Sequence, residues 1–313
     1  MTERTQQFDV IIIGGGPAGM SASLWCSDLG MSSVVLEGSS EFGGQLLRTY
    51  NPIHNYLGAS AESGRELRDR FLEHLEERKL DLRVGAEVKR VNSVDRAVEL
   101  ADGTEMRASA IIFATGIRRR RLGVRGEDDF QGCGMMDSGK RDPEAAAGKR
   151  VVVIGGGDAA LENALILGPR VKRLTVVHRR YKFSARPDFV DLADKNPRID
   201  FLMNSRVLEI GGTGQVEFVE IEDVATGNRS RLETDAVLVR IGVEPNSEPI
   251  RGQAELDLNG FIIVDCNGET SVPGVFAIGD VANPMAPTVS TAAGMGATAA
   301  KKAFAMINSN AGR

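Results

Sequence analysis

Two glycine-rich segments of this chain carry the dinucleotide-binding fingerprint, in which a β-strand turns through glycines into a helix. The first, FDVIIIGGGPAG over residues 8–19, has Gly14, Gly16 and Gly19 in its turn. The second, RVVVIGGGDAA over residues 150–160, has Gly155, Gly157 and Ala160 at the equivalent positions. A single copy would be weak evidence. Two copies, each between an apolar run and a helical pattern, indicate a protein that holds two dinucleotides.

The two copies are in register beyond their glycines. Gly14 and Gly155 are 141 residues apart, and so are Glu37 and His178, which end the next strand of each copy. The glycines let the backbone approach a pyrophosphate, which binds the amide groups at the start of the helix. The choice between dinucleotides is then made at the end of the following strand.

The two strand ends predict different cofactors. In the first copy, SSVVLE ends in Glu37, whose carboxylate is placed to accept hydrogen bonds from an adenosine ribose that has no 2′-phosphate. In the second, LTVVHRR ends in His178, Arg179 and Arg180. Arginines bind a 2′-phosphate through charge-assisted hydrogen bonds of about 1.5–3 kcal/mol each, so even one favours NADPH over NADH about tenfold. We therefore expect FAD in the first site and NADPH in the second.

The composition limits the other functions to consider. Of 313 residues, 42% are hydrophobic and 26% charged, which is typical of a soluble globular protein with room for two domains. The net charge of −5 gives no general reason to expect nucleic acid or anionic membrane as a partner. The N-terminus MTERTQQ leads directly into the first strand, so we expect no signal peptide and a cytoplasmic protein. The three cysteines are far apart, and no CxxC or metal-ligand spacing occurs.

The order of the predicted elements indicates an α/β protein in which one nucleotide domain is inserted into another. We expect βαβ units at 8–37 and 150–178, an amphipathic helix at 62–79, and short strands at 82–100. Further strands are expected at 199–210, 215–222, 230–241 and within 251–281, before a closing helix at 289–307. The predicted FAD-binding domain is residues 1–116 with 247–313, and the predicted NAD(P)H-binding domain is residues 117–246, both Rossmann-like with three ββα layers.

Taken together, these motifs resemble the low-molecular-weight thioredoxin reductase family over nearly the whole chain. The resemblance rests on residues 14–19 with Glu37, on Gly43, Gly44 and Gln45, on Ala114, Thr115 and Gly116, on residues 155–160, on His178, Arg179 and Arg180, and on Gly279 and Asp280. It implies an FAD- and NADPH-dependent oxidoreductase that forms a homodimer. It also implies that the two domains rotate during turnover.

The resemblance also implies which residues bind each cofactor. For FAD they are Gly14, Gly16, Pro17, Ala18, Gly19, Glu37, Gly44, Gln45, Tyr50, Asn55, Val88, Ala114, Thr115, Gly116, Gly279, Asp280, Thr288 and Val289. For NADPH they are Gly155, Gly157, Asp158, Ala159, Ala160, His178, Arg179, Arg180, Arg186, Ile241 and Gly242. Tyr50 is similar to a tyrosine that stacks on the isoalloxazine ring in the related ferredoxin–NADP reductases, which also lack the CxxC pair.

Three departures from the family concern chemistry. The two cysteine positions of the family's CxxC pair fall on Ser138 and Arg141, which cannot cycle between thiol and disulphide. The family's third NADPH-binding arginine falls on Ser184, with Arg186 close by as a substitute. An Arg-Gln-Ala triplet near the flavin becomes Pro287, Thr288 and Val289, which removes a positive charge there. Reduction of thioredoxin through an internal dithiol is therefore excluded.

Several functions stay open at this point. The favoured one passes electrons from NADPH through FAD to an external carrier similar to ferredoxin or flavodoxin. The alternatives are a flavin oxidase of a small thiol or metabolite, and a non-catalytic FAD- or NADPH-binding sensor. Arginines 118–121 form either a solvated linker or a basic landing patch for an acidic carrier. The candidate catalytic residues are His54, Asp137 and Ser138, and no metal site is expected.

Overall fold

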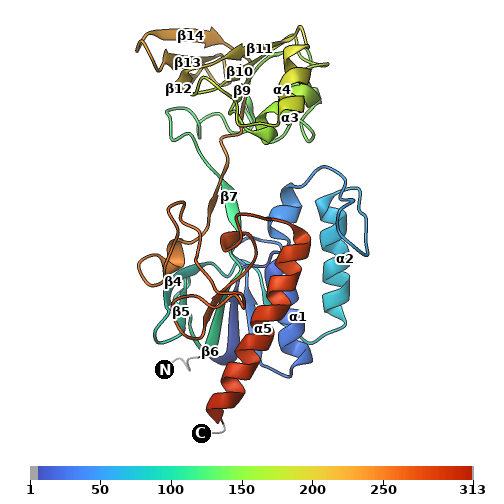
Figure 1. Ribbon diagram of the computed structural model, residues 1–313, viewed down its shortest axis with the longest axis vertical. Coiled ribbons are helices and arrows are strands. Elements are labelled where there is room, and N and C mark those ends of the chain that lie inside the picture. Colours follow the sequence, from blue (N-terminus) through green and yellow to red (C-terminus); the bar gives the residue numbers. More distant parts are fainter. Residues whose placement is uncertain (1–5, 312–313) are drawn as a thin grey trace. The chain divides into compact units, whose positions relative to one another are not determined.

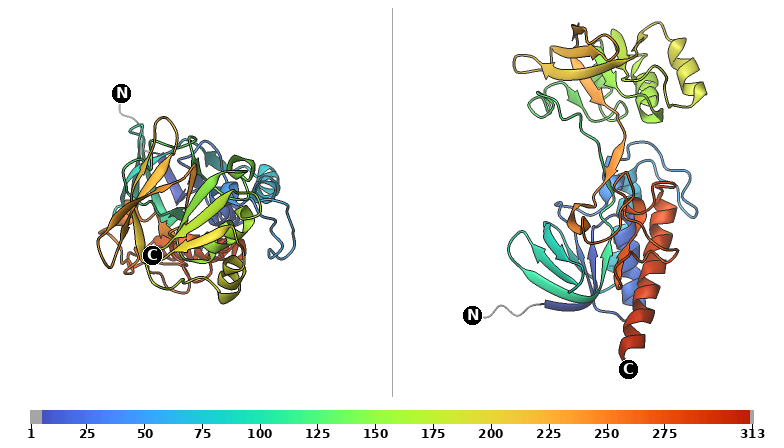
Figure 2. Two further views of the ribbon diagram at one scale, coloured as in Figure 1. Left: turned by 90° about the horizontal axis from the view of Figure 1, so that it is seen from above. Right: turned by 60° about the vertical axis from the view of Figure 1, so that its left-hand side comes forward.

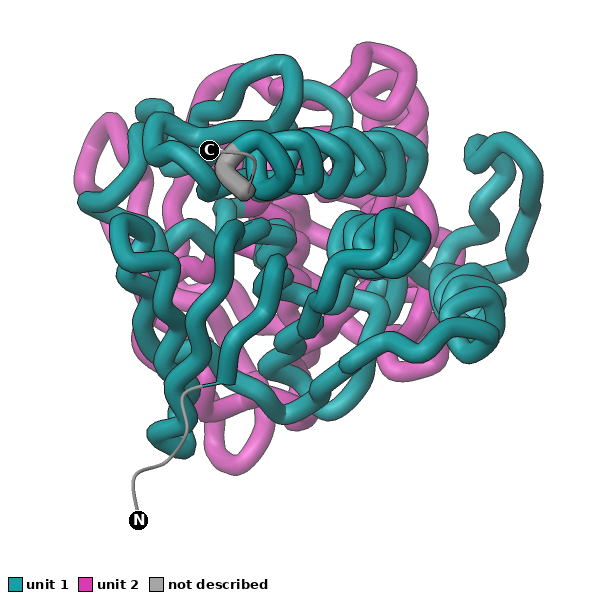
Figure 3. Tube along the Cα trace, turned by 90° about the horizontal axis from the view of Figure 1, so that it is seen from below, with its two compact units in different colours: residues 1–118, 244–313 teal, residues 119–243 magenta. Residues whose placement is uncertain are grey.

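The computed structural model describes residues 6–311, and the chain divides into two compact units. Unit 1 is formed by residues 1–118 and 244–313, and unit 2 by residues 119–243 (Figure 3). The unit boundaries lie within a few residues of the domain boundaries proposed from the sequence, after residues 116 and 246. Each unit is built on a mostly parallel sheet of its own, in agreement with the predicted α/β class.

Unit 1 contains a seven-stranded sheet in the order β3-β2-β1-β6-β5-β4, with β17 also paired to β6. Pairing is parallel from β3 to β6 and for β17, and antiparallel where β5 joins β6 and β4. The strands are β1 (Gln6–Ile13), β2 (Ser33–Leu36), β3 (Asp81–Arg83), β4 (Val88–Asn92), β5 (Ala97–Leu100), β6 (Glu105–Phe113) and β17 (Val275–Ala277).

The helices of unit 1 are α1 (Pro17–Asp28), α2 (Gly64–Glu76) and α5 (Val289–Ala311), with the short 3-10 helices η1 (Gly44–Arg48), η3 (Glu248–Ile250) and η4 (Gly279–Val281). α5 runs beside α1 on one face of the sheet (Figures 1 and 2). The central strand β1 ends in the run Val10, Ile11, Ile12 and Ile13, which is buried on both faces as expected for a parallel strand covered on both sides.

Unit 2 has three layers. A parallel sheet in the order β11-β10-β9-β15-β8 has α3 and α4 packed on one face and the antiparallel sheet β12-β13-β14 on the other. Its helices are α3 (Asp158–Leu167), α4 (Pro187–Asp194) and η2 (Glu144–Ala146). Its strands are β8 (Met135–Met136), β9 (Arg150–Ile154), β10 (Arg173–Val177), β11 (Ile199–Leu202), β12 (Ser205–Gly211), β13 (Phe218–Asp223), β14 (Arg229–Glu233) and β15 (Ala236–Val239). The two crossings between the units, β7 (Ile117–Arg119) and β16 (Val243–Pro245), pair as a two-stranded ribbon.

Some predicted elements are divided or shortened in the structure. The expected strand 199–210 is two strands from different sheets, because Asn204 adopts a left-handed conformation (φ 50°) and turns the chain between them. The run 230–241 is likewise divided into β14 and β15. Within 251–281 only β17 forms a strand, and the rest is turns, isolated bridges and the 3-10 helix η4. Helix α4 was not predicted.

Candidate functional site

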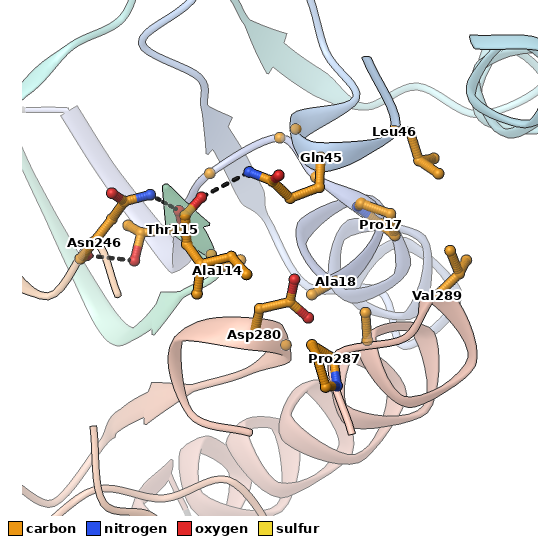
Figure 4. Close-up of a pocket in the computed structure, with 18 of the residues that line it drawn as sticks. Pro17, Ala18, Gln45, Leu46, Ala114, Thr115, Asn246, Asp280, Pro287 and Val289 are labelled. Carbon is orange, nitrogen blue, oxygen red and sulfur yellow. Dashed lines mark hydrogen bonds between the residues drawn. The ribbon is translucent and has the colours of Figure 1, made fainter. Parts of the chain in front are cut away.

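A solvent-open cavity of about 400 Å³ lies in unit 1, at the carboxyl ends of β1 and β6 (Figure 4). Ligands bind at this edge of open α/β sheets. Segments that are distant in the sequence meet here, namely residues 14–18, 37, 39, 44–49, 114–118, 246, 278–280, 287–289 and 292.

The first glycine-rich turn forms one wall of the cavity. Gly14 has φ +111°, and a Cβ atom on it would lie 2.3 Å from the carbonyl oxygen of Ala114, so only glycine fits there. Helix α1 follows with Gly16 at its N-cap and no side chain bonded to its first amides. Those N–H groups and the positive end of the helix remain available to an anion, as the predicted binding of a diphosphate requires.

Glu37 lies in the cavity and organises the turn. One of its carboxylate oxygens accepts the amide N–H of Gly15 and the other that of Ser39, both at 2.8 Å. A carboxylate has about four acceptor positions, so lone pairs remain for the ribose hydroxyls that the sequence predicts there.

Asp280, on η4, is half-buried and points into the cavity (Figure 4). Burial raises its pKa above the ordinary value, and its carboxylate bonds to none of the described side chains or amides. An acceptor left without donors at this depth is suited to hydroxyl groups of a ligand. The open amides of α1, the remaining acceptor positions of Glu37 and the carboxylate of Asp280 are groups that suit the diphosphate and the hydroxyls of FAD.

Loop 38–43, which covers the glycine-rich turn, is clamped to α2. The carboxylate of Glu41 accepts hydrogen bonds from both terminal nitrogens of Arg65, at 3.0 and 3.1 Å, and from Nη1 of Arg68, at 3.2 Å. Arg68 also donates to the carbonyl of Phe42 at 3.3 Å, and its side chain is only 12% exposed. The bond from Arg65 lowers the pKa of Glu41, which keeps the carboxylate charged and the loop fixed.

A second network fixes the opposite wall. Gln45 Nε2 donates to the carbonyl of Ile117 at 2.7 Å (Figure 4). Asn246 and Thr115 exchange side-chain hydrogen bonds to each other's carbonyl oxygens, both at 2.7 Å. Arg118 binds Glu244 and Asn246, at 2.8 and 2.9 Å, and also Glu248. These contacts hold the start of β7 and the end of β16 against the cavity.

Most of the predicted FAD-binding residues line this cavity. The exceptions are Gly19, which is buried behind the turn, and Tyr50, Asn55 and Val88, which lie outside the lining. The sequence reasoning missed Gly15, Ser39, Leu46, Leu47, Arg48, Thr49, Ile117, Arg118, Asn246, Ile278 and Ala292, and it named Pro287 only as part of the triplet near the flavin. Several are direct neighbours of predicted residues. No sequence motif around Asn246 indicates that it lines the cavity, because only the fold brings it next to Thr115.

The second glycine-rich turn, in unit 2, leads into α3 with Gly157 at its N-cap and no side-chain cap. The His178 ring rests against Gly156, its Nε2 lies 3.1 Å from the carbonyl of Lys182, and it stacks on Phe183. Burial, and then the neighbouring arginines, lower the pKa of His178, which favours a neutral ring. His178 thus shapes the segment that carries Arg179 and Arg180.

The three arginines of the predicted phosphate site differ in availability. Arg179 and Arg180 are exposed, and their guanidinium groups bond to none of the described residues. Arg186 is already engaged: Nε lies 3.1 Å from Asp158, the Arg186 amide binds the same carboxylate at 2.7 Å, and the guanidinium covers the ring of Phe189. Ser184 binds the carbonyl of Gly156 and closes the turn. Ile241 and Gly242 follow β15 at the same edge of the sheet.

The candidate catalytic residues are divided between the two units. His54 is exposed in unit 1. In unit 2, Asp137 is paired with Arg141, and Ser138 is buried, with its hydroxyl accepting the amide of Lys140 at 3.2 Å. All three cysteines are free thiols. Cys26 is buried, and burial raises its pKa to about 12, whereas Cys133 and Cys266 are exposed.

Each of the four consecutive arginines has a partner. Arg118 is bound as described above, and Arg119 donates to the carbonyl of Asp137 at 2.6 Å. Arg120 donates to the carbonyl of Val243 at 2.8 Å, and Arg121 pairs with Asp128. These bonds favour the linker interpretation over a free basic patch.

Within residues 6–311, no helix is long and apolar enough to cross a membrane, and no group of His, Cys, Asp and Glu side chains is arranged to hold a metal ion.

Comparison with known proteins supports the predicted resemblance. The family model described as pyridine nucleotide-disulphide oxidoreductase matches residues 8–296. The thioredoxin reductase of Mycolicibacterium smegmatis is 36% identical over 93% of this chain and 94% of its own length. An NADH dehydrogenase of Bacillus subtilis is 34% identical over 96% of this chain but only 58% of its own length. The crystal structure of Lactococcus lactis thioredoxin reductase has a TM-score of 0.82 and 31% identity, covering 96% of this chain and 99% of that one.

Proposed function

The chain belongs to the pyridine nucleotide-disulphide oxidoreductase family, and on this basis we propose that it is an FAD-dependent NADPH oxidoreductase without an internal redox disulphide. The observation that carries the proposal is the pairing of an intact dinucleotide cavity in unit 1 with two unengaged arginines at the strand end of unit 2. The positions that the family uses for its dithiol hold Ser138 and Arg141, and the three thiols lie at distant positions in the sequence.

The residues present fit both cofactors. For FAD, the first amides of α1 bind the diphosphate, Glu37 accepts the adenosine ribose, and Asp280 accepts hydroxyls of the ribityl chain. For NADPH, the first amides of α3 bind the diphosphate, and Arg179 and Arg180 bind the 2′-phosphate. Bound FAD supplies the conversion between two-electron and one-electron transfer. The chain binds and positions the two nucleotides.

The overall reaction balances without a protein thiol. One NADPH gives NADP⁺, one proton and two electrons, which reduce two one-electron carriers. We propose a carrier similar to ferredoxin or flavodoxin as the acceptor, and a homodimer as the working form. Support for a direct acceptor comes from the serine and arginine at the dithiol positions, because electrons then have no route through the protein's own sulphur.

Anaerobic mixing of FAD-loaded protein with NADPH, and separately with NADH, tests the proposal through flavin absorbance. Rapid bleaching by NADPH, and much slower bleaching by NADH, is the expected result. If neither nucleotide bleaches the flavin, the proposal is wrong. Reduction by a small thiol or metabolite would then favour the oxidase, and tight cofactor binding without turnover would favour the sensor. Light scattering of the holoprotein measures the oligomeric state.

A further inference from the structure

The charged side chains that line the cavity of unit 1 are Glu37, Asp280, Arg118 and Arg48. Glu37 is bonded to two backbone amides, and Asp280 is half-buried and faces the proposed ribityl chain. Arg118 is neutralised by Glu244 and Glu248. Arg48 alone among these four is an exposed cation that forms no ion pair or hydrogen bond through its side chain with the described residues.

The backbone that carries Arg48 is held firmly. Arg48 is the last residue of η1, whose Gln45 is tied to the carbonyl of Ile117 at 2.7 Å. Leu46 is 3% exposed, and the Thr49 hydroxyl donates to the carbonyl of Gln45 at 3.0 Å. The backbone of Arg48 is therefore held at the cavity wall, and its side chain extends from there into solvent.

Arg48 also lies on the element that neighbours an uncharged part of the wall. Leu46 belongs to a hydrophobic cluster against which Val289 packs, and Pro287, Thr288 and Val289 line the cavity with no charge. The whole chain carries a net charge of −5, so its overall field does not attract anions. An anionic molecule that approaches this cavity needs a local cation, and Arg48 is available.

We propose that Arg48 binds an anionic group of the electron acceptor, a carboxylate or a group of similar charge, at the mouth of the cavity. This inference rests on the proposed function and adds the charge class of its acceptor. A guanidinium presents several donors in a rigid plane that matches a carboxylate, and an exposed charge-assisted contact of this kind changes affinity by about tenfold. Arg48 is thereby a specificity-determining residue.

The test compares an anionic with a neutral acceptor in the FAD-loaded enzyme. Two ferricyanide ions take the two electrons of one NADPH, which becomes NADP⁺ and releases one proton. One p-benzoquinone takes the same two electrons with two protons, one from NADPH and one from solvent. The variants are Arg48→Gln, Arg48→Lys and the control Arg107→Gln. Arg107 is an exposed arginine of unit 1 on β6, outside the cavity lining and without an ion pair to the described residues.

For Arg48→Gln we expect kcat/KM for ferricyanide to fall about tenfold while that for p-benzoquinone is unchanged. Arg48→Lys keeps most of the ferricyanide activity, and Arg107→Gln leaves kcat/KM unchanged for both acceptors. Added salt lowers the ferricyanide rate of the wild type more than that of Arg48→Gln. A [2Fe–2S] ferredoxin and a small carboxylate-bearing quinone then show whether the anion comes from a protein or a small molecule.

Two results overturn the inference. An equal loss with both acceptors shows that Arg48 supports the fold or the cofactor in general. A rise in the FAD dissociation constant of Arg48→Gln shows that its anion is the cofactor's own diphosphate. Failure of the proposed function looks different, because wild-type flavin then does not bleach with NADPH at all.

Discussion

Nucleotide preference is predicted to depend on Arg179 and Arg180 jointly. The family's third phosphate-binding arginine is replaced by Ser184, and Arg186 already contacts Asp158 and Phe189. Arg179 and Arg180 are therefore the arginines available to bind the phosphate. Both are exposed, so we take the lower end of the 1.5–3 kcal/mol range for each charge-assisted bond. That value corresponds to about tenfold for each arginine and about a hundredfold for the pair. We therefore expect Arg179→Gln with Arg180→Gln to lower the NADPH preference about a hundredfold.

The assay is anaerobic stopped-flow bleaching of the flavin at varied NADPH and NADH, which gives a dissociation constant for each nucleotide. The double variant raises the NADPH constant and leaves the NADH constant unchanged, because NADH has no 2′-phosphate. Arg206→Gln is the control, since Arg206 is an exposed arginine of the same unit that pairs with Glu222. Equal weakening of both nucleotides would refute the reasoning. An unchanged preference would show that Arg186 leaves Asp158 to take the phosphate.

Three further predictions concern the cavity and the turns. Glu41→Gln releases the clamp on loop 38–43, and we expect the FAD dissociation constant, measured by flavin fluorescence, to rise about two- to fivefold. The control is Glu66→Gln, which removes an exposed pair with Arg70 within α2 and should leave the FAD dissociation constant unchanged. Burial raises the pKa of Asp280, so the stability of the apoprotein falls as pH rises above the ordinary carboxyl pKa. Asp280→Asn should therefore raise the apoprotein Tm at neutral pH, give no gain in acid, and weaken FAD binding. A Tm gain that persists in acid would contradict this reasoning. Gly155→Ala places a Cβ atom 2.0 Å from a backbone carbonyl oxygen, at a φ of +149°. The control is Gly85→Ala, whose Cβ meets nothing within 4 Å and whose φ of +65° costs about 1–2 kcal/mol. Urea unfolding should show a larger loss of unfolding free energy for Gly155→Ala, and equal losses would be inconsistent with the clash.

Local patterns predicted the parts of the site that local physics determines. The turns at Gly14 and Gly155 and the strand end at Glu37 are each specified by a few adjacent residues, and the structure has them at the predicted places. The clamp of Glu41 by Arg65 and Arg68 joins residues more than twenty positions apart, and no periodicity reveals it. The same holds for Asn246 and Thr115, 131 positions apart.

The missed secondary structure has a similar origin. Asn204 separates two strands because one residue is left-handed, although the apolar pattern around it continues. Helix α4 is only eight residues long, too short for a clear helical period. The sequence does not show which arginines have partners, and only the fold shows that arginines 118–121 bond to acidic or carbonyl groups.

The cavity of unit 1 takes its walls from both ends of the chain, from the turn at Gly14 to Ala292 at the start of α5. A ribosome therefore completes unit 2 before the last cavity residues, Gly279 to Ala292, have been synthesised. Until then strand β6 lacks its neighbour β17, and the nascent chain has no complete cavity. In the proposed function, FAD therefore binds only after residue 292 has been synthesised, and a chain released before β17 carries all of unit 2 but an incomplete unit 1.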